Sequence, residues 1–143
     1  MAPKVWGKIA DSSAEPAPLA DVKARLKAVI DIAAEEERLK YITGGAGQAM
    51  TYQQKSDEAK RYFAALEAGG TPEPSDFPLL SAEVGITAPT LGEVAAIVSG
   101  AFLQWQVIGS AIEAARLGTK ASIEAAATAS DAEAAANAVV WPG

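Results

Sequence analysis

Apolar residues recur along most of this chain at intervals of three and four, which is the spacing of amphipathic helices. The pattern predicts a first helix over Leu19–Ile42, and Gly44–Gly47 should end it, because glycine is common just past a helix. The apolar face of this helix consists of Leu19, Val22, Leu26, Val29, Ile30 and Ala33.

A second helix is expected from Thr51, because Thr51-Tyr52-Gln53-Gln54 fits a capping box, in which the threonine and the glutamine satisfy free backbone N–H groups. Gly69-Gly70 should end this helix. A proline-rich turn over residues 71–78 follows, and then a short helical piece, Leu79–Val84.

The third long segment contains no charged residue from Val94 to Ile112. Thr90-Leu91-Gly92-Glu93 forms a second capping box that opens it. Because apolar residues lie on several sides, we expect a central helix with neighbours around it. Its heptad seam, with alternating spacings of three and four, comprises Leu91, Val94, Val98, Ala101, Trp105, Ile108, Ile112 and Ala115.

The two ends of the chain differ from this helical middle. Met1–Pro18 alternates basic and apolar residues and then carries prolines, which predicts an extended arm. At the other end, Ser130-Asp131-Ala132-Glu133 is a third capping box and predicts a short last helix before an apolar terminus. The predicted fold is therefore all-α, a helical bundle (19–143) with one long central apolar helix and an extended N-terminal arm (1–18).

Charge and composition exclude several kinds of chemistry. The chain has 143 residues and a net charge of −6, whereas nucleic-acid binding relies on clustered lysine and arginine. It has no cysteine and no histidine, so the usual zinc ligands and histidine-based triads are missing. We expect no catalytic residue, no cofactor and no metal. The first sixteen residues lack the apolar stretch of a secretory signal.

Four local features have both a functional and a structural interpretation. Glu35–Glu37 lie on different faces of a helix, so a solvated surface is favoured over a carboxylate site. Gly44–Gly47 lacks the GK[ST] ending of a phosphate-binding loop. Trp105 is favoured as a core residue over a pocket residue. Val94–Ile112 is long enough to cross a bilayer, but its serines and glutamines are costly in hydrocarbon, so burial in protein is favoured.

Several stretches resemble small tail proteins of bacteriophages and prophages. The run Tyr41–Lys55, which contains GAGQAMTY, is similar to the linker and second helix of that family, and Val5–Asp11 resembles the opening of tail-fibre assembly proteins. The other similar stretches are Asp76–Leu80, Ala82–Ile86, Trp105, Ile108-Gly109, Ala111–Glu113 and Arg116-Leu117.

The resemblance implies a non-enzymatic structural protein of the phage tail, in the fibre or baseplate region, made in the bacterial cytoplasm and carried in the virion. A tail-fibre assembly chaperone is the alternative, followed by a membrane-acting phage protein. The partners would be other tail or fibre proteins, with a homo-oligomer expected. The residues expected to contact partners are Val5, Trp6, Ile9, Trp105, Val140 and Trp141.

Overall fold

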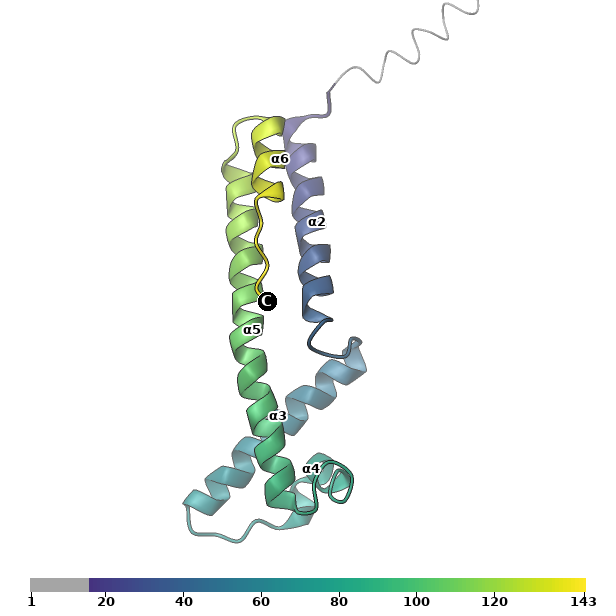
Figure 1. Cartoon of the computed structure of the whole chain (residues 1–143), viewed down its shortest axis with the longest axis vertical. Helices are drawn as coiled ribbons and strands as arrows, with labels where there is room; N and C mark the ends of the chain where they lie inside the picture. Colours follow the sequence, from purple (N-terminus) through teal and green to yellow (C-terminus); the bar gives the residue numbers. More distant parts are fainter. Residues whose placement is uncertain (1–15) are drawn as a thin grey trace, which may run out of the picture. The chain divides into compact units, whose positions relative to one another are not determined.

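The computed structural model describes residues 16–143 and is all-α, as expected (Figure 1). No β-strand occurs in these residues. The predicted arm contacts of Val5, Trp6 and Ile9 lie outside them. The elements in chain order are α2 (Leu19–Arg38), α3 (Ala46–Glu67), the 3₁₀ turn η2 (Pro74–Asp76), α4 (Pro78–Ala82), α5 (Leu91–Ala125) and α6 (Ala129–Asn137).

The helices of the predicted helical domain belong to two compact units. One unit combines α2 up to Glu35 with Glu113–Trp141, which covers the end of α5, all of α6 and most of the C-terminal segment. The other combines Glu36–Ile112 with the last two residues, and so contains α3, η2, α4 and the first part of α5.

The core of the first unit forms where α2, α5 and α6 pack together (Figure 1). Helix α2 contributes Val22, Leu26 and Ile30, whose spacing of four places them on one helical face. Ile123 comes from α5, and α6 offers only small side chains, so its backbone lies close to its neighbours. The segment after α6 packs on this core through Val139 and Trp141.

The core of the second unit joins α3, α4 and the start of α5. Phe77 and Leu80 are buried against Ala59 of α3 and against Val94 and Val98 of α5. The ring of Tyr62 meets Phe77 edge-on, with 5.6 Å between the ring centroids, a favourable aromatic geometry.

A buried carboxylate ties α4 to α3 inside this unit. Glu58 is completely buried, and its Oε1 accepts hydrogen bonds from the backbone N–H groups of Leu79 (3.0 Å) and Leu80 (3.1 Å). Gln54 Nε2 donates to Oε2 at 3.1 Å. The first N–H groups of a helix have no partner within the helix, so Glu58 provides α4 with a cap from a distant part of the chain.

Two predicted capping residues, Thr51 and Ser130, and one helix end are wrong. Helix α3 begins at Ala46 after Gly45, whose φ of 110° suits glycine, and Thr51 lies inside the helix, donating to the carbonyl of Gly47. The short last helix, α6, is confirmed, but its capping residue is Thr128, whose hydroxyl accepts from the N–H of Asp131. Helix α2 ends at Arg38 instead of Ile42, because turn hydrogen bonds replace the helical pattern there.

The capping residue of α5 was predicted correctly. Thr90 precedes α5, and its hydroxyl accepts a hydrogen bond from the N–H of Glu93 at 3.2 Å. This short-range interaction needs only four consecutive residues, which is why the sequence located it.

The expectation that α5 is contacted on several sides is wrong for the middle of the helix. Val94, Ala95 and Val98 are buried, but no residue from Ser99 to Ala111 is fully buried. Among the described residues, α5 is the one helix long and apolar enough to cross a membrane, and 11% of its most apolar 18-residue window is buried. The chain itself covers one side of this part of α5 and leaves the other exposed.

Candidate functional site

The second unit has a groove between α3 and α5 with a volume of about 740 Å³. Its walls are mostly apolar, and its size falls within the usual range of sites that bind small molecules or side chains of a partner. We call it the aromatic groove. Its apolar and aromatic lining residues are Tyr41, Ile42, Ala49, Tyr52, Ile97, Val98, Ala101, Phe102, Trp105 and Ile108.

Helical periodicity brings these residues to one wall. On α5, Val98, Phe102, Trp105 and Ile108 are three or four residues apart and so lie on one side of the helix. The Trp105 indole lies over the next turn, where a Cβ on Gly109 would come within 3.1 Å of the ring. Gly109 therefore leaves room for Trp105, which is half-buried in the groove wall, and the prediction of a core tryptophan is wrong.

The two charged residues that line this groove are paired with each other. Lys55 and Glu83 form an ion pair, and Thr87 Oγ1 donates to Glu83 Oε1 at 2.6 Å. Burial raises the pKa of the Glu83 carboxyl, but the hydrogen bonds from Lys55 and Thr87 outweigh it, so this pKa is lowered from its usual value. The two opposite charges cancel, which leaves the groove with no net charge.

One buried polar atom of the groove lining has no hydrogen-bond partner among the described residues. The hydroxyl of Ser56 is buried and makes no hydrogen bond within the described residues. Nucleophilic catalysis by serine requires a base within hydrogen-bond reach. Lys55 is bound to Glu83, so the lining residues provide no hydrogen-bonded pair of nucleophile and base. The absence of enzyme activity stays a prediction.

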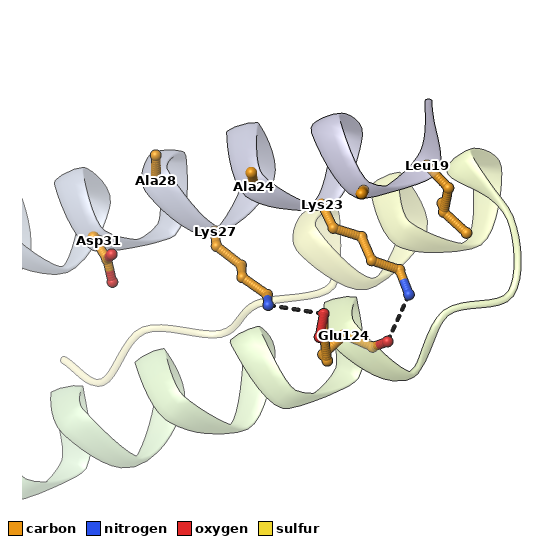
Figure 2. Close-up of a pocket in the computed structure, with 8 residues that line it drawn as sticks. Leu19, Lys23, Ala24, Lys27, Ala28, Asp31 and Glu124 are labelled. Atoms are coloured by element: carbon orange, nitrogen blue, oxygen red, sulfur yellow. Dashed lines mark hydrogen bonds and ion pairs between the residues drawn. The ribbon is translucent and has the colours of Figure 1, made fainter. Parts of the chain in front are cut away.

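The first unit has a shallower hollow of about 570 Å³ between α2 and α5 (Figure 2). Two of its lysines point to the same residue. Lys23 Nζ donates to the backbone carbonyl of Glu124 at 2.6 Å, and Lys27 Nζ donates to its carboxylate at 2.8 Å. The hydrogen bond from Lys27 lowers the pKa of Glu124. Because its cations are already bound, this hollow suits an acidic ligand poorly.

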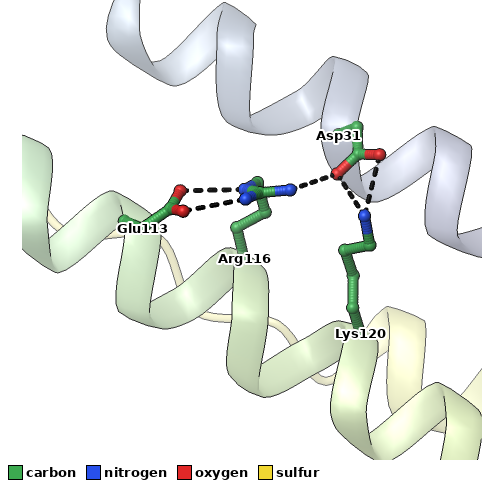
Figure 3. Close-up of polar contacts among 4 residues, drawn as sticks. All are labelled: Asp31, Glu113, Arg116 and Lys120. Carbon is green, nitrogen blue, oxygen red and sulfur yellow. Dashed lines mark hydrogen bonds and ion pairs between the residues drawn. The ribbon is translucent and has the colours of Figure 1, made fainter.

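A cluster of four charged residues joins α2 to α5 in the same unit (Figure 3). Arg116 donates to Glu113 through two nitrogens and to Asp31, each at 2.8 Å. Lys120 donates to both oxygens of Asp31, at 2.9 and 3.0 Å. The hydrogen bonds from Lys120 and then Arg116 lower the pKa of Asp31. With two acids and two bases the cluster is neutral, which favours a stabilising role over a binding site.

Of the residues expected to contact partners, one lies in the aromatic groove. Trp105 is part of its wall, whereas Val140 is 82% exposed in the C-terminal segment. Trp141 packs on the core of the first unit, so much of its apolar surface is covered within the chain. Their contacts with partners stay predictions. Within residues 16–143, no group of three acidic side chains is placed to hold a metal ion.

The sequence interpretation missed most of the groove. Tyr41, Tyr52 and Phe102 line it, yet none of them was singled out as a partner-binding residue. The spacing of Phe102, Trp105 and Gly109 is the available signal, because a small residue four positions after a tryptophan makes space for the ring on one face.

Comparison of this chain with family models, with curated proteins and with solved structures finds no match.

Proposed function

We propose that this chain is a non-enzymatic structural protein of a bacteriophage tail, in the fibre or baseplate region, and that its aromatic groove binds an apolar segment of a neighbouring tail protein. One observation supports this proposal: the stretches that resemble phage tail proteins meet at the aromatic groove. Tyr41–Lys55 supplies Tyr41 and Tyr52 to the groove, Ala82–Ile86 supplies Glu83, and the α5 stretches supply Trp105 and Ile108.

The chemistry of the groove favours a protein partner over a reaction. Tryptophan and tyrosine are enriched among the residues that contribute most to protein–protein binding. They bury large areas while their polar atoms keep contact with water. Outside the groove lining, the ammonium group of Lys60 lies over the Phe102 ring, with 4.9 Å from Nζ to the centroid, and the lining itself stays neutral. Aliphatic side chains of a partner would fill a neutral, half-open hollow of this kind.

Mass spectrometry of purified phage particles tests this function. We expect the wild-type chain in stoichiometric amount. Trp105→Ala should reduce its incorporation at least about tenfold, since a buried aromatic anchor contributes about 2 kcal/mol or more to binding. Met50→Ala is the matched control, because Met50 is an exposed large apolar residue of α3 outside the groove lining. Absence of the wild-type chain from particles would reject the structural role.

The alternative function is that of a tail-fibre assembly chaperone. The aromatic groove is open in a single chain, and a transient binder needs such a site. A chaperone would be absent from finished particles, and its co-expression would keep an otherwise insoluble fibre protein in solution. Loss of that effect in Trp105→Ala, with Met50→Ala unchanged, would assign the chaperone activity to the groove.

A membrane-acting role is the third candidate, favoured by the length and exposure of α5. Exposed Gln104 and Gln106 oppose it, because unpaired amides are costly in hydrocarbon. Expression without detergent followed by high-speed centrifugation separates the candidates. A protein that pellets with membranes supports this role, and one that stays in the supernatant rejects it.

A further inference from the structure

A second series of uncharged positions runs along α5 on the side opposite its heptad seam. It comprises eight positions from Ala96 to Ala121, at alternating spacings of four and three residues, and we call it the outer seam. All eight residues are exposed. Three have larger apolar side chains, namely Leu103, Val107 and Leu117, and the other five are alanine, glycine or serine.

This exposure is unusual for a soluble helix. Val107 is 74% exposed and Leu103 is 59% exposed, so their apolar surfaces are largely open to water. The alternation of four and three is the repeat by which two helices pack side by side over many turns. The next positions of the same series are Glu93 and Glu124, which mark the ends of the outer seam. None of its eight residues lines the aromatic groove.

We propose that the outer seam packs against the outer seam of a second copy of this chain, with the two α5 helices antiparallel. A two-fold axis between Ile108 and Gly109 places Leu103 against the partner's Ala114 and Leu117 against the partner's Gly100. Every large side chain then meets a small one, which is the interdigitation that close packing requires.

The remaining layers follow the same rule. Val107 meets the partner's Ser110, and Ala96 meets the partner's Ala121. A parallel pair would instead place each residue against its own counterpart, with Leu103 against leucine and Gly100 against glycine. Layers would then be crowded or empty in turn, and both faults destabilise packing.

The charges beside the outer seam agree with an antiparallel pair. Gln106 would lie near the partner's Glu113, and Ser99 near the partner's Lys120, so no like charges meet along the seam. At each end Glu93 approaches the partner's Glu124, whose carboxylate is already bound by Lys27. This pairing of acids limits the contact to the uncharged stretch. Antiparallel helix dipoles add a small attraction.

The size of the contact predicts a weak dimer. The outer seam covers about 39 Å of helix at about 1.5 Å per residue, and a strip about 10 Å wide gives about 400 Å² per copy. A standard interface buries about 800 Å² per partner. We therefore expect dissociation in the range of about 10 to about 100 µM, so that the dimer forms only at high concentration.

Sedimentation velocity over a range of concentrations tests whether the chain dimerises through the outer seam. The wild-type chain should change from monomer to dimer between about 1 and about 500 µM. Val107→Lys should remain monomeric, because each copy would bring a charge into the contact. Ile86→Lys is the matched control, since Ile86 is 84% exposed and lies outside α5, and it should dimerise like the wild type. Circular dichroism should be equal for all three.

Two results of that experiment would overturn the proposal. One is a wild-type chain that stays monomeric at about 500 µM, and the other is a Val107→Lys variant that dimerises normally. Flotation with phosphatidylcholine–phosphatidylglycerol vesicles tests whether lipid covers the outer seam instead. A monomeric wild-type chain that floats, beside a Val107→Lys variant that does not, would assign the outer seam to lipid and overturn the dimer.

Disulfide cross-linking tests the direction of the helices, because the chain has no cysteine of its own. Leu103→Cys and Ala114→Cys, carried on chains of different size, should form a mixed disulfide, whereas each alone should give little product. Ser130→Cys on α6 is exposed and measures random collision. Self-linking of Leu103→Cys without the mixed product would show a parallel pair and overturn the antiparallel arrangement.

These experiments are independent of the phage assignment. If the dimer does not form, phage particles can still contain the chain, and its incorporation can still depend on Trp105. A chain absent from particles can still dimerise through Val107. Failure of one proposal is therefore distinguishable from failure of the other.

Discussion

Replacing Glu58 by alanine should destabilise the second unit more than any other change of a single charged residue in it. The side chain is completely buried, and its carboxylate accepts from the N–H groups of Leu79 and Leu80 and from the amide of Gln54. All three neighbours are donors. None of them can replace the acceptor that alanine removes.

The magnitude follows from these contacts. A hydrogen bond to a charged group contributes about 1.5–3 kcal/mol, and a buried donor left without an acceptor costs about 1–3 kcal/mol. Leu80 N is buried and Leu79 N is partly buried, so two such donors lose their acceptor. We expect Glu58→Ala to lower the free energy of unfolding by about 3–5 kcal/mol, against a total of about 5–15 kcal/mol for a typical domain.

Urea denaturation followed by circular dichroism measures this loss, and native-state hydrogen exchange locates it. The amide protons of Leu79 and Leu80 should lose protection first in Glu58→Ala. Glu58→Gln keeps one acceptor oxygen and should lose only about 1–2 kcal/mol. Glu67→Ala is the matched control, because Glu67 is also on α3 but is exposed, and it should change stability by less than about 0.5 kcal/mol.

An unchanged urea midpoint for Glu58→Ala, together with unchanged protection of Leu79 and Leu80, would refute the reasoning. The carboxylate would then contribute nothing to the start of α4. A loss equal to that of Glu67→Ala would have the same meaning.

Three further predictions concern packing, backbone and charge. Leu80→Ala should lower the free energy of unfolding by about 2–5 kcal/mol in urea denaturation, because the fully buried leucine leaves a cavity. Gly85→Ala should lower the free energy of unfolding by about 1–2 kcal/mol, because Gly85 has a φ of 84°. Gly47→Ala should raise it by up to about 1 kcal/mol, because Gly47 is helical and has open space around it. Equal effects of the two substitutions would contradict this backbone explanation. Asp31→Asn should lose about 0.5–1 kcal/mol at neutral pH, a small value because the side chain is 44% exposed. The pKa of Asp31 is lowered in the folded state, so its contribution to stability is present above about pH 4 and is lost as the pH falls through that lowered pKa. A difference in stability between Asp31→Asn and the wild type that persists in acid would contradict this reasoning.

Local patterns in the sequence located most of the helices. The spacing of Val22, Leu26 and Ile30 identified the buried face of α2, and these three residues form part of a core. Thr90 located the start of α5, because capping involves only residues within one turn. The misassigned capping residues of α3 and α6 show the limit of this approach, since Thr51 and Ser130 fit the capping pattern equally well but lie within helices.

The candidate site was predicted less well. Trp105 was named as a partner-binding residue but was expected in a core, and in the structure it is half-buried in the wall of the aromatic groove. A seam of apolar positions indicates that one side of a helix is covered, but not how far along the helix the cover extends. Helix α3 meets α5 over only part of that seam, so the groove opens where the packing of Val94 and Val98 ends.

The sequence by itself determined the all-α class, the long uncharged helix and the absence of cysteine and histidine, because each depends on composition or on residues within a turn of one another. Only the tertiary structure decided that Glu58 reaches Leu79 and Leu80 and that the outer side of α5 stays exposed. These features depend on which helices meet. Periodicity assigns a face to each helix, but the neighbour that covers this face is selected by packing between residues far apart in the chain.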